Sequence, residues 1–406
     1  MIKPKRLPDF SMGAAVAALL VAFGVFAVPP ETGAQRTRGA QAPAFKVDPL
    51  WPKPLPNHWV LGSVTGVAVD AQDHIWITHR GADSLGNNEK GAILNPPTGC
   101  CVPAPQVLEF DQAGNLLSHW GGPGKGFDWP QSTGGIAVDQ KGNVWIAAAG
   151  QPEAAPRPAG APAAGAARPA PPKPQDAHVL KFSRNGEFLL QIGHAGKVEG
   201  SDSKTSLNRP ASVSVDAAAN EVYVADGFGN HRVVVFDAET GAYKRHWGAY
   251  GEKPDDGSLG PYDPNAAPAK QFRIVSCAAI SKDGMVYVCD RQNDRIQVFK
   301  KDGKFVKEAF VSKTTLGDGS VWDIAFSNDP QQRFVYVADG HDKKVFVLRR
   351  ETMEVVSSFG DGGRMPGQFY GVGSIAVDSK GNVYTGETYE GKRVQKFVFK
   401  GMAASR

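Results

Sequence analysis

Six similar apolar runs of about five residues occur along the chain. Ten side chains that could bind a ligand lie at the end of such a run or just beyond it. They are His79, Arg80, Asp226, Phe228, Asp290, Arg291, Asp339, His341, Glu387 and Tyr389. Four of the six runs end in a carboxylate; the run-ending residues are His79, Ala148, Asp226, Asp290, Asp339 and Glu387. If the ends of the six runs lie together around a channel in the folded protein, these side chains form an acidic channel mouth with two guanidinium groups. Such a mouth could bind a peptide, a small molecule or a protein partner.

The same carboxylates have a structural alternative. An Asp at the end of a strand accepts hydrogen bonds from backbone amides, or pairs with an arginine a few residues later, as Asp226 and Arg232 would. Glu387 departs from the repeated Asp, and Arg80 has no basic counterpart in most of the runs. These two residues are therefore the stronger functional candidates, and Arg80 is the candidate for a catalytic role.

One pattern of four short apolar runs separated by turns occurs six times in the chain. The first runs are GVAVD at 66–70, GIAVD at 135–139, SVSVD at 212–216, CAAIS at 277–281, DIAFS at 323–327 and SIAVD at 374–378. In the second runs, such as VYVAD at 222–226, branched residues point to one side and the aromatic residue to the other, as in a strand. The repeat predicts an all-β, six-bladed β-propeller with four antiparallel strands per blade. An open β-sandwich gives no reason for six equivalent units.

The sixth unit lacks a fourth strand of its own. FKVDPLW at 45–51 is extended and apolar enough to supply one, which would close the ring and remove its last unpaired edge. We therefore expect a propeller over 45–401, preceded by a flexible segment at 35–44. The Pro, Ala and Gly-rich stretch at 151–176 is expected to be a disordered insertion, whereas the mixed polar and apolar insertion at 82–105 is expected to be ordered.

Residues 1–34 are typical of an export signal, because three basic residues precede an apolar stretch from about Met12 to Val28. We expect cleavage near Ala34 and a periplasmic or secreted protein. The alternative is an uncleaved anchor, which would be the one membrane contact expected. The formal net charge of +4 is spread without a basic block, so nucleic acid is not an expected partner.

Four cysteines in an oxidising compartment allow two disulfide bonds. Cys277 and Cys289 would lie nearly opposite each other on adjacent strands of the fourth unit. That register is compatible with a disulfide bond and equally with two buried thiols. Cys100 and Cys101 are neighbours in sequence, so no simple pairing scheme follows for them.

The runs VYVADGFGNHRVVVF at 222–236 and VYVCDRQNDRIQVF at 286–299 resemble NHL repeats, and the resemblance covers all six units. Within that class the chain is similar to bacterial propellers related to peptidyl-α-hydroxyglycine α-amidating lyase. The segments that carry this similarity include WITHRG at 76–81, DGFGN at 226–230 and AVDSKGNVY at 376–384. The resemblance implies a zinc ion held by three histidines in the propeller mouth, acting as a Lewis acid, with a tyrosine and an arginine beside it.

Carried over residue by residue, the arginine of that family falls on Arg80, within an intact HRG. The three histidine positions fall on Gly134, Ser276 and Gly373, the tyrosine position on Phe228, and the acidic position linked to a structural calcium on Ser374. Glycine offers no ligand atom and serine replaces imidazole poorly, so the resemblance implies that the family's zinc centre is absent. His79, His231 and His341 lie at or just after the ends of second runs, so they could bind a metal at a different position of the mouth. Zinc and calcium are both possible there, and neither is assigned.

Three functions are consistent with these observations. The leading hypothesis is an exported NHL-repeat propeller that binds a peptide, small molecule or protein partner at an acidic channel mouth, without the family's zinc-dependent activity. The alternative is an enzyme resembling the amidating lyase, with an altered metal site and Arg80 orienting the substrate. The third is a structural module of an envelope assembly, with residues 151–176 as its contact.

Overall fold

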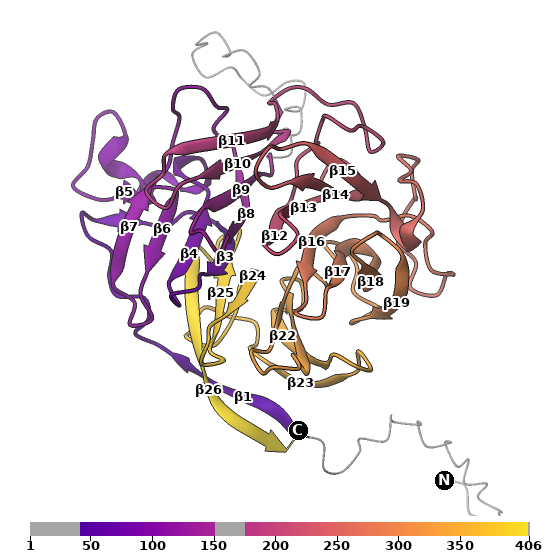
Figure 1. Ribbon diagram of the computed structural model, residues 1–406. Helices are drawn as coiled ribbons and strands as arrows, with labels where there is room; N and C mark the ends of the chain where they lie inside the picture. The colour runs from indigo at the N-terminus through magenta and orange to yellow at the C-terminus, as the bar shows by residue number, and fades with distance from the viewer. Residues whose placement is uncertain (1–40, 151–174, 405–406) are drawn as a thin grey trace, which may run out of the picture. The chain divides into compact units, whose positions relative to one another are not determined.

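The computed structural model describes residues 41–150 and 175–404, which belong to one compact unit. The export signal predicted at 1–34, the segment 35–40 and most of the insertion predicted at 151–176 lie outside the described residues. Six four-stranded antiparallel sheets surround a common centre as the blades of a propeller (Figure 1). The predicted all-β, six-bladed architecture is confirmed.

The blades are numbered in chain order, and each is given from its inner strand to its outer strand. Blade 1 contains β3 (Val64–Val69), β4 (Ile75–His79), β6 (Val107–Phe110) and β7 (Leu116–Trp120). Blade 2 contains β8 (Thr133–Val138), β9 (Val144–Ala148), β10 (His178–Phe182) and β11 (Phe188–Gly193). Blade 3 contains β12 (Ser212–Asp216), β13 (Glu221–Asp226), β14 (Arg232–Asp237) and β15 (Tyr243–Trp247).

Blade 4 contains β16 (Val275–Ile280), β17 (Met285–Asp290), β18 (Arg295–Lys300) and β19 (Phe305–Phe310). Blade 5 contains β20 (Asp323–Phe326), β21 (Phe334–Asp339), β22 (Lys344–Arg349) and β23 (Val355–Phe359). Blade 6 contains β24 (Val372–Val377), β25 (Val383–Glu387), β26 (Arg393–Ala404) and β1 (Gln41–Asp48). The short elements are η1 (Ala82–Ser84), η2 (Asn87–Glu89), η3 (Gly91–Ile93), η4 (Ala249–Gly251), η5 (Arg291–Asn293) and the parallel pair β2 (Trp59–Val60) and β5 (Val102–Pro103).

The Asp that ends several inner strands organises the turn that follows. In blade 2, Asp139 Oδ1 accepts a hydrogen bond from the backbone amide of Asn143, and Oδ2 accepts one from the indole of Trp145. Asp378 of blade 6 uses the same arrangement, with the hydroxyl of Tyr384 as the second donor. One carboxylate therefore fixes the turn and orients the aromatic ring of the next strand, which is why the pattern recurs in the sequence.

Apolar side chains fill six separate clusters, one at each interface between neighbouring blades. Trp76 of blade 1, for example, is fully buried among Ile146 and Phe182 of blade 2. Burying a large apolar side chain contributes about 2–3 kcal/mol, so each interface supplies much of the stability of its two blades. The ring needs all six interfaces, because a blade on its own leaves both faces exposed to water.

The N-terminal strand closes the ring, as predicted. β1 supplies the outer strand of blade 6 and pairs antiparallel with β26, with Phe45 opposite Phe399. The strand begins at Gln41 rather than at the predicted Phe45, and β26 continues to Ala404 rather than ending at 401. The two strands extend together because each gives the other backbone partners as far as the pair Gln41 and Ala404.

The insertion of blade 2 ends earlier than predicted. Asp176, the last residue of the predicted insertion, is 1% exposed and accepts hydrogen bonds from the backbone amides of Gln131, Ser132 and Gly150. A carboxylate with three backbone donors is part of the blade. Asp176 therefore belongs to the blade and not to the insertion.

The insertion of blade 1 is ordered, as expected, and contains η1, η2, η3 and β5. A disulfide bond joins its neighbouring cysteines, Cys100 and Cys101. The second disulfide bond joins Cys277 of β16 to Cys289 of β17, which are paired directly in the sheet with Cα atoms 4.9 Å apart. Of the two alternatives for Cys277 and Cys289, the structure has the disulfide bond and not two buried thiols.

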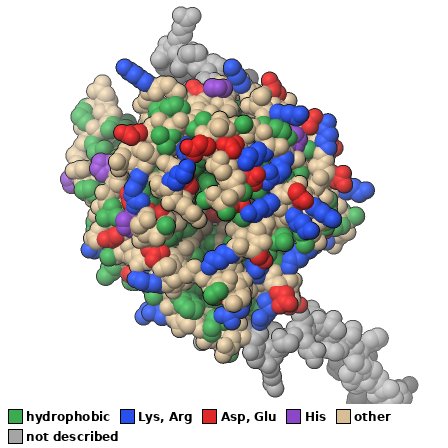
Figure 2. All heavy atoms as spheres, in the orientation of Figure 1, with side chains coloured by type: hydrophobic (Ala, Val, Ile, Leu, Met, Phe, Trp, Pro, Cys, Tyr) green, Lys and Arg blue, Asp and Glu red, His purple; other side chains and the backbone are tan. Residues whose placement is uncertain are grey.

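Charged side chains of both signs are intermixed over the face of the molecule drawn in Figure 2. This mixture agrees with the small net charge of +4. Within residues 41–150 and 175–404, no helix has the length and apolar character needed to cross a membrane.

We predict that ring closure depends on Phe45, whose ring contacts those of Tyr336, Phe359 and Phe399. Phe45→Ala should lower the free energy of unfolding by about 2 kcal/mol, because an aromatic side chain at the closing seam is lost. Urea unfolding followed by tryptophan fluorescence measures the change. The control is Leu50→Ala, since Leu50 is 83% exposed and should change stability by no more than about 0.5 kcal/mol. Equal stability of the two variants would contradict closure through β1.

Candidate functional site

A central channel is the main candidate site. It encloses a cavity of about 240 Å³ and receives side chains or backbone from the inner strands of all six blades. Residues that follow second strands line its mouth; they are Arg80, Ala149, Phe228, Arg291, Thr388 and Tyr389. Of the ten residues predicted to bind a ligand, four therefore face one cavity: Arg80, Phe228, Arg291 and Tyr389.

The predicted acidic mouth does not form. Asp226, Asp290, Asp339 and Glu387 are 0% exposed, and none of them is among the residues that line the channel. Arg232 Nε lies 2.9 Å from Asp226 Oδ2, Arg295 Nε lies 2.7 Å from Asp290 Oδ2, and Arg393 pairs with Glu387. Burial without a cation would cost a carboxylate several kcal/mol, so Asp226, Asp290 and Glu387 turn into their blades toward an arginine instead of toward the channel.

These buried acceptors hold the loop that leads into the inner strand of the same blade. The backbone amides of Asn208, Arg273 and Tyr370 donate to Asp226, Asp290 and Glu387 respectively. In blade 1 the acceptor is His79 Nδ1, which receives the Gly62 amide at 3.1 Å. In blade 2, where Ala148 has no acceptor, Asp176 takes over the role with the Ser132 amide. His79, Asp226, Asp290 and Glu387 therefore form the structural hydrogen bonds that were the alternative to ligand binding.

Asp339 of blade 5 departs from this arrangement. The residue opposite it is Lys344 instead of arginine, and the described residues contain no ion pair to Asp339. Its Oδ1 accepts the backbone amides of His341 and Asp342, but its Oδ2 is buried without a hydrogen-bond partner. Burial raises the pKa of Asp339 to about 8, so this carboxyl carries a proton at neutral pH.

Arg80 is a cationic group of the channel that has no counterion among the described residues. It follows β4 and lines the channel, and its backbone is fixed because the Arg80 amide donates to Ser63 O at 2.9 Å. Within the described residues its guanidinium forms no ion pair, and its buried Nε has no hydrogen-bond partner. A guanidinium in a partly dehydrated channel favours an anionic group, because Arg presents paired donors that match a carboxylate.

Arg291 reaches the channel from blade 4 but is already engaged. Its guanidinium carbon lies 3.4 Å from the ring centroid of Trp322, and its Nε donates to Asp318 O at 2.6 Å. The Tyr389 hydroxyl donates to Asp318 Oδ2 at 2.9 Å. The mouth is therefore a connected set of one guanidinium, two aromatic rings and a shared carboxylate, with Tyr389 44% exposed to an incoming ligand.

The residues at the expected zinc positions meet at the channel but do not fit the metal. Gly134, Ser276 and Gly373 all line the cavity, so the register of the carry-over brings the three positions together. Two of them have no side-chain ligand atom, and the Ser276 hydroxyl donates to Val321 O. Three neutral imidazoles are what such a zinc site requires, and the described lining residues include no histidine.

The histidines considered for a relocated metal do not converge on the channel either. His79 is 0% exposed, with Nδ1 receiving the Gly62 amide and Nε2 2.9 Å from Pro105 O, so both ring nitrogens are occupied. Burial lowers the pKa of His79, which keeps its ring neutral. His231 and His341 are not among the residues that line the cavity, so the ligand-binding role predicted for His341 has no support in its position.

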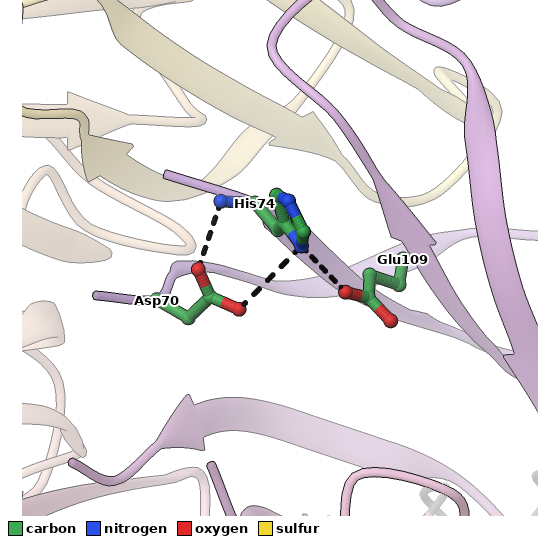
Figure 3. A group of neighbouring side chains, drawn as sticks. All are labelled: Asp70, His74 and Glu109. Carbon is green, nitrogen blue, oxygen red and sulfur yellow. Dashed lines mark hydrogen bonds and ion pairs between the residues drawn. The ribbon is translucent and has the colours of Figure 1, made fainter. Parts of the chain in front are cut away.

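A second group of possible metal ligands lies at the opposite end of blade 1. Asp70, His74 and Glu109 direct their side chains toward one point (Figure 3). Arg184 of blade 2 occupies that point: its NH2 nitrogen lies 3.0 Å from Asp70 Oδ2 and 2.6 Å from His74 Nδ1, and pairs with Glu109. A guanidinium already supplies the positive charge, so this cluster joins blades 1 and 2 and is not a site for an added ion.

Asp323 is a channel residue that the sequence reasoning missed. It begins β20, lines the cavity and is half-buried. The sequence signal is the residue with which each first run begins. In chain order these residues are Gly, Gly, Ser, Cys, Asp and Ser. Five of these are small or neutral, and one is a carboxylic acid at the wall of the channel.

Comparison with known proteins adds a family and distant relatives. Residues 207–236, which include β12, β13 and β14 of blade 3, match the NHL repeat. The chain is 27% identical over 253 residues to peptidyl-glycine alpha-amidating monooxygenase B of Xenopus laevis, covering 61% of this chain and 24% of that protein. It is 25% identical over 341 residues to peptidyl-glycine alpha-amidating monooxygenase of Mus musculus, covering 81% of this chain and 29% of that protein. The chain thus spans less than a third of these two relatives.

Two further similarities complete the comparison. The chain is 24% identical over 301 residues to NHL repeat-containing protein 3 of Mus musculus, covering 73% of this chain and 65% of that protein. A solved structure described as streptogramin B lyase has a TM-score of 0.49 and 10% identity, covering 88% of this chain and 98% of that chain.

We predict that Asp339→Asn stabilises the protein at pH 8. An unfolded Asp titrates near pH 3.9, whereas folding raises the pKa of Asp339 to about 8, so the folded state binds the extra proton between these values. Wild-type stability therefore falls as pH rises toward 8, and the amide avoids that loss. The variant should be more stable than the wild type by several kcal/mol at pH 8, and by almost nothing at pH 4.

The matched control is Asp290→Asn, at the same position of blade 4. There the carboxylate is paired with Arg295, so the substitution should lower the free energy of unfolding by about 3 kcal/mol at both pH values. Thermal unfolding by circular dichroism measures both variants. Destabilisation of Asp339→Asn at pH 8 would show that Asp339 is held as a paired anion.

Proposed function

We propose that this NHL-repeat propeller binds a small ligand carrying a carboxylate in its central channel, with Arg80 as the charge partner. The observation that carries the proposal is the Arg80 guanidinium, which faces the cavity and forms no ion pair among the described residues. The buried arginines of the blades, such as Arg232, are each satisfied by a carboxylate. Arg80 is thus available for an anion that comes from outside the chain.

The dimensions of the channel favour a small or slender ligand. The cavity of about 240 Å³ is smaller than the roughly 300–1,000 Å³ typical of sites for drug-sized molecules. Its wall combines small inner-strand residues with the aromatic rings of Phe228, Trp322 and Tyr389 at the mouth. A ligand of this kind would place its anionic end at Arg80 and its apolar part against the rings.

The relatives support a peptide as the source of the carboxylate. The amidating monooxygenases are named for peptidylglycine, a peptide that ends in a glycine carboxylate. The activity in that name belongs to the relatives. For this chain, a lyase-like reaction with an altered metal site is the alternative to binding alone. The inner-strand residues do not fit the zinc ion that such a reaction would use, so the proposal is confined to binding.

Export is part of the proposal. The Cys277–Cys289 disulfide bond supports it, since such bonds persist in oxidising compartments such as the periplasm and the cell exterior. The basic and apolar pattern at 1–34 supports the same location. A peptide ligand met outside the cytoplasm is consistent with both.

We predict that Arg80→Ala weakens binding of the dipeptide phenylalanyl-glycine by 10- to 100-fold, through loss of a charged hydrogen-bonding partner. Phenylalanyl-glycinamide, which lacks the carboxylate, should bind the wild-type protein weakly and be insensitive to the substitution. Isothermal titration calorimetry measures both ligands. Arg80→Lys should recover part of the affinity, because it keeps the charge and loses the paired donors.

The control substitution is Arg333→Ala, which removes an arginine 58% exposed at a turn of blade 5. It should leave both affinities unchanged. Equal binding of phenylalanyl-glycine and its amide would show that Arg80 does not bind the carboxylate. An effect of Arg80→Ala no larger than that of Arg333→Ala would show the same, and either result would contradict the proposal.

A further inference from the structure

Asp323 stands at a register position that can be compared directly in five blades. In these blades the inner-strand residue lies opposite the residue that precedes the end of the second strand. Ser212 faces Ala225, Cys277 faces Cys289, and Ser374 faces Gly386, as Asp323 faces Ala338. The other blades fill the position with a small or neutral side chain, so the blade fold does not require a carboxyl group there.

The contacts of Asp323 leave it without a cation. Its Oδ1 accepts the backbone amide of Ile324 at 2.9 Å, and its Oδ2 accepts that of Ile375 in blade 6 at 3.0 Å. No ion pair to Asp323 occurs among residues 41–150 and 175–404. Each oxygen has one donor in these contacts and can accept a further hydrogen bond. Next to Ile375, the buried Ser374 hydroxyl has no hydrogen-bond partner.

The channel thus holds two groups of opposite charge that do not pair with each other. Arg80 belongs to blade 1 and Asp323 to blade 5, and blade 6 with its residues Ser374 and Tyr389 lies between them. The remaining charged group that lines the cavity is Arg291, already stacked on Trp322 and bonded to Asp318. A single ligand with a negative end and a positive end would match both unpaired groups.

We propose that the ligand of the channel is zwitterionic, a short peptide whose carboxylate meets Arg80 and whose free amino group meets Asp323. This inference rests on the proposed function and adds the second recognition element. An ammonium group donates three hydrogen bonds, enough for the free lone pairs of Asp323 and the Ser374 hydroxyl. The two ends of the peptide would then set its orientation in the channel.

The titration of Asp323 agrees with this arrangement. Burial raises the pKa of Asp323 to about 7, against the opposing effect of its two backbone donors. The other titratable groups that line the cavity are Arg80, Arg291 and Tyr389, and none of them contributes to the shift of Asp323. A carboxyl poised near neutrality ionises when an ammonium group arrives, so the amine creates the charge that holds it.

The test compares phenylalanyl-glycine with N-acetyl-phenylalanyl-glycine by calorimetry at pH 7.5. The two dipeptides share the carboxylate and differ in the amino group. Wild-type protein should bind the free amine at least tenfold more tightly than the acetylated form. Asp323→Asn should bring the two affinities within about twofold, by weakening the free amine and leaving the acetylated form unchanged. Asp323→Ser, which copies Ser212 and Ser374, should do the same and is the second variant if the amide disturbs folding.

The outcomes separate this inference from the function on which it rests. If both dipeptides bind the wild-type protein equally and both depend on Arg80, the zwitterion inference is wrong and the carboxylate site stands. If both Asp323 variants still prefer the free amine, another group binds the amine and the inference is wrong. If neither dipeptide binds, both proposals are wrong. A preference that disappears in both variants, while Arg80→Ala weakens both dipeptides, supports the inference.

Discussion

The structure depends on one recurring constraint, the need of a blade for a buried hydrogen-bond acceptor near the end of its second strand. In five blades the acceptor receives a backbone amide of the entering loop, as Asp226 receives that of Asn208, and an arginine neutralises it in blades 3, 4 and 6. An unpaired amide or carboxylate at that depth would cost several kcal/mol. The constraint draws Asp226, Asp290 and Glu387 into the blades and so away from the channel.

What is left is a small cavity with charges that the fold does not satisfy. Arg80 and Asp323 line it from different blades, and neither forms an ion pair among the described residues. The buried arginines of the blades are paired closely, as Arg295 is with Asp290 at 2.7 Å. The contrast between these paired arginines and the unpaired Arg80 is what supports the proposal that the channel is a binding site.

Much of the fold could be predicted from the sequence, because period-two runs and turn residues act locally. The turn role of Asp139 and closure by a strand containing Phe45 follow from such patterns. The site was harder, since a pattern places Asp290 at a strand end without saying whether it faces the channel or Arg295. Asp176 acts as an acceptor from outside the repeat, and no local pattern could identify it. Asp323 could have been found by comparing the first letters of the six first runs.

The binding of an external carboxylate by Arg80 inside the channel can be tested with a crystal structure of the protein and phenylalanyl-glycine. We expect the dipeptide in the central cavity, with its carboxylate oxygens about 3 Å from the Arg80 guanidinium nitrogens. A dipeptide bound outside the channel, or one in the channel with its carboxylate away from Arg80, would contradict it.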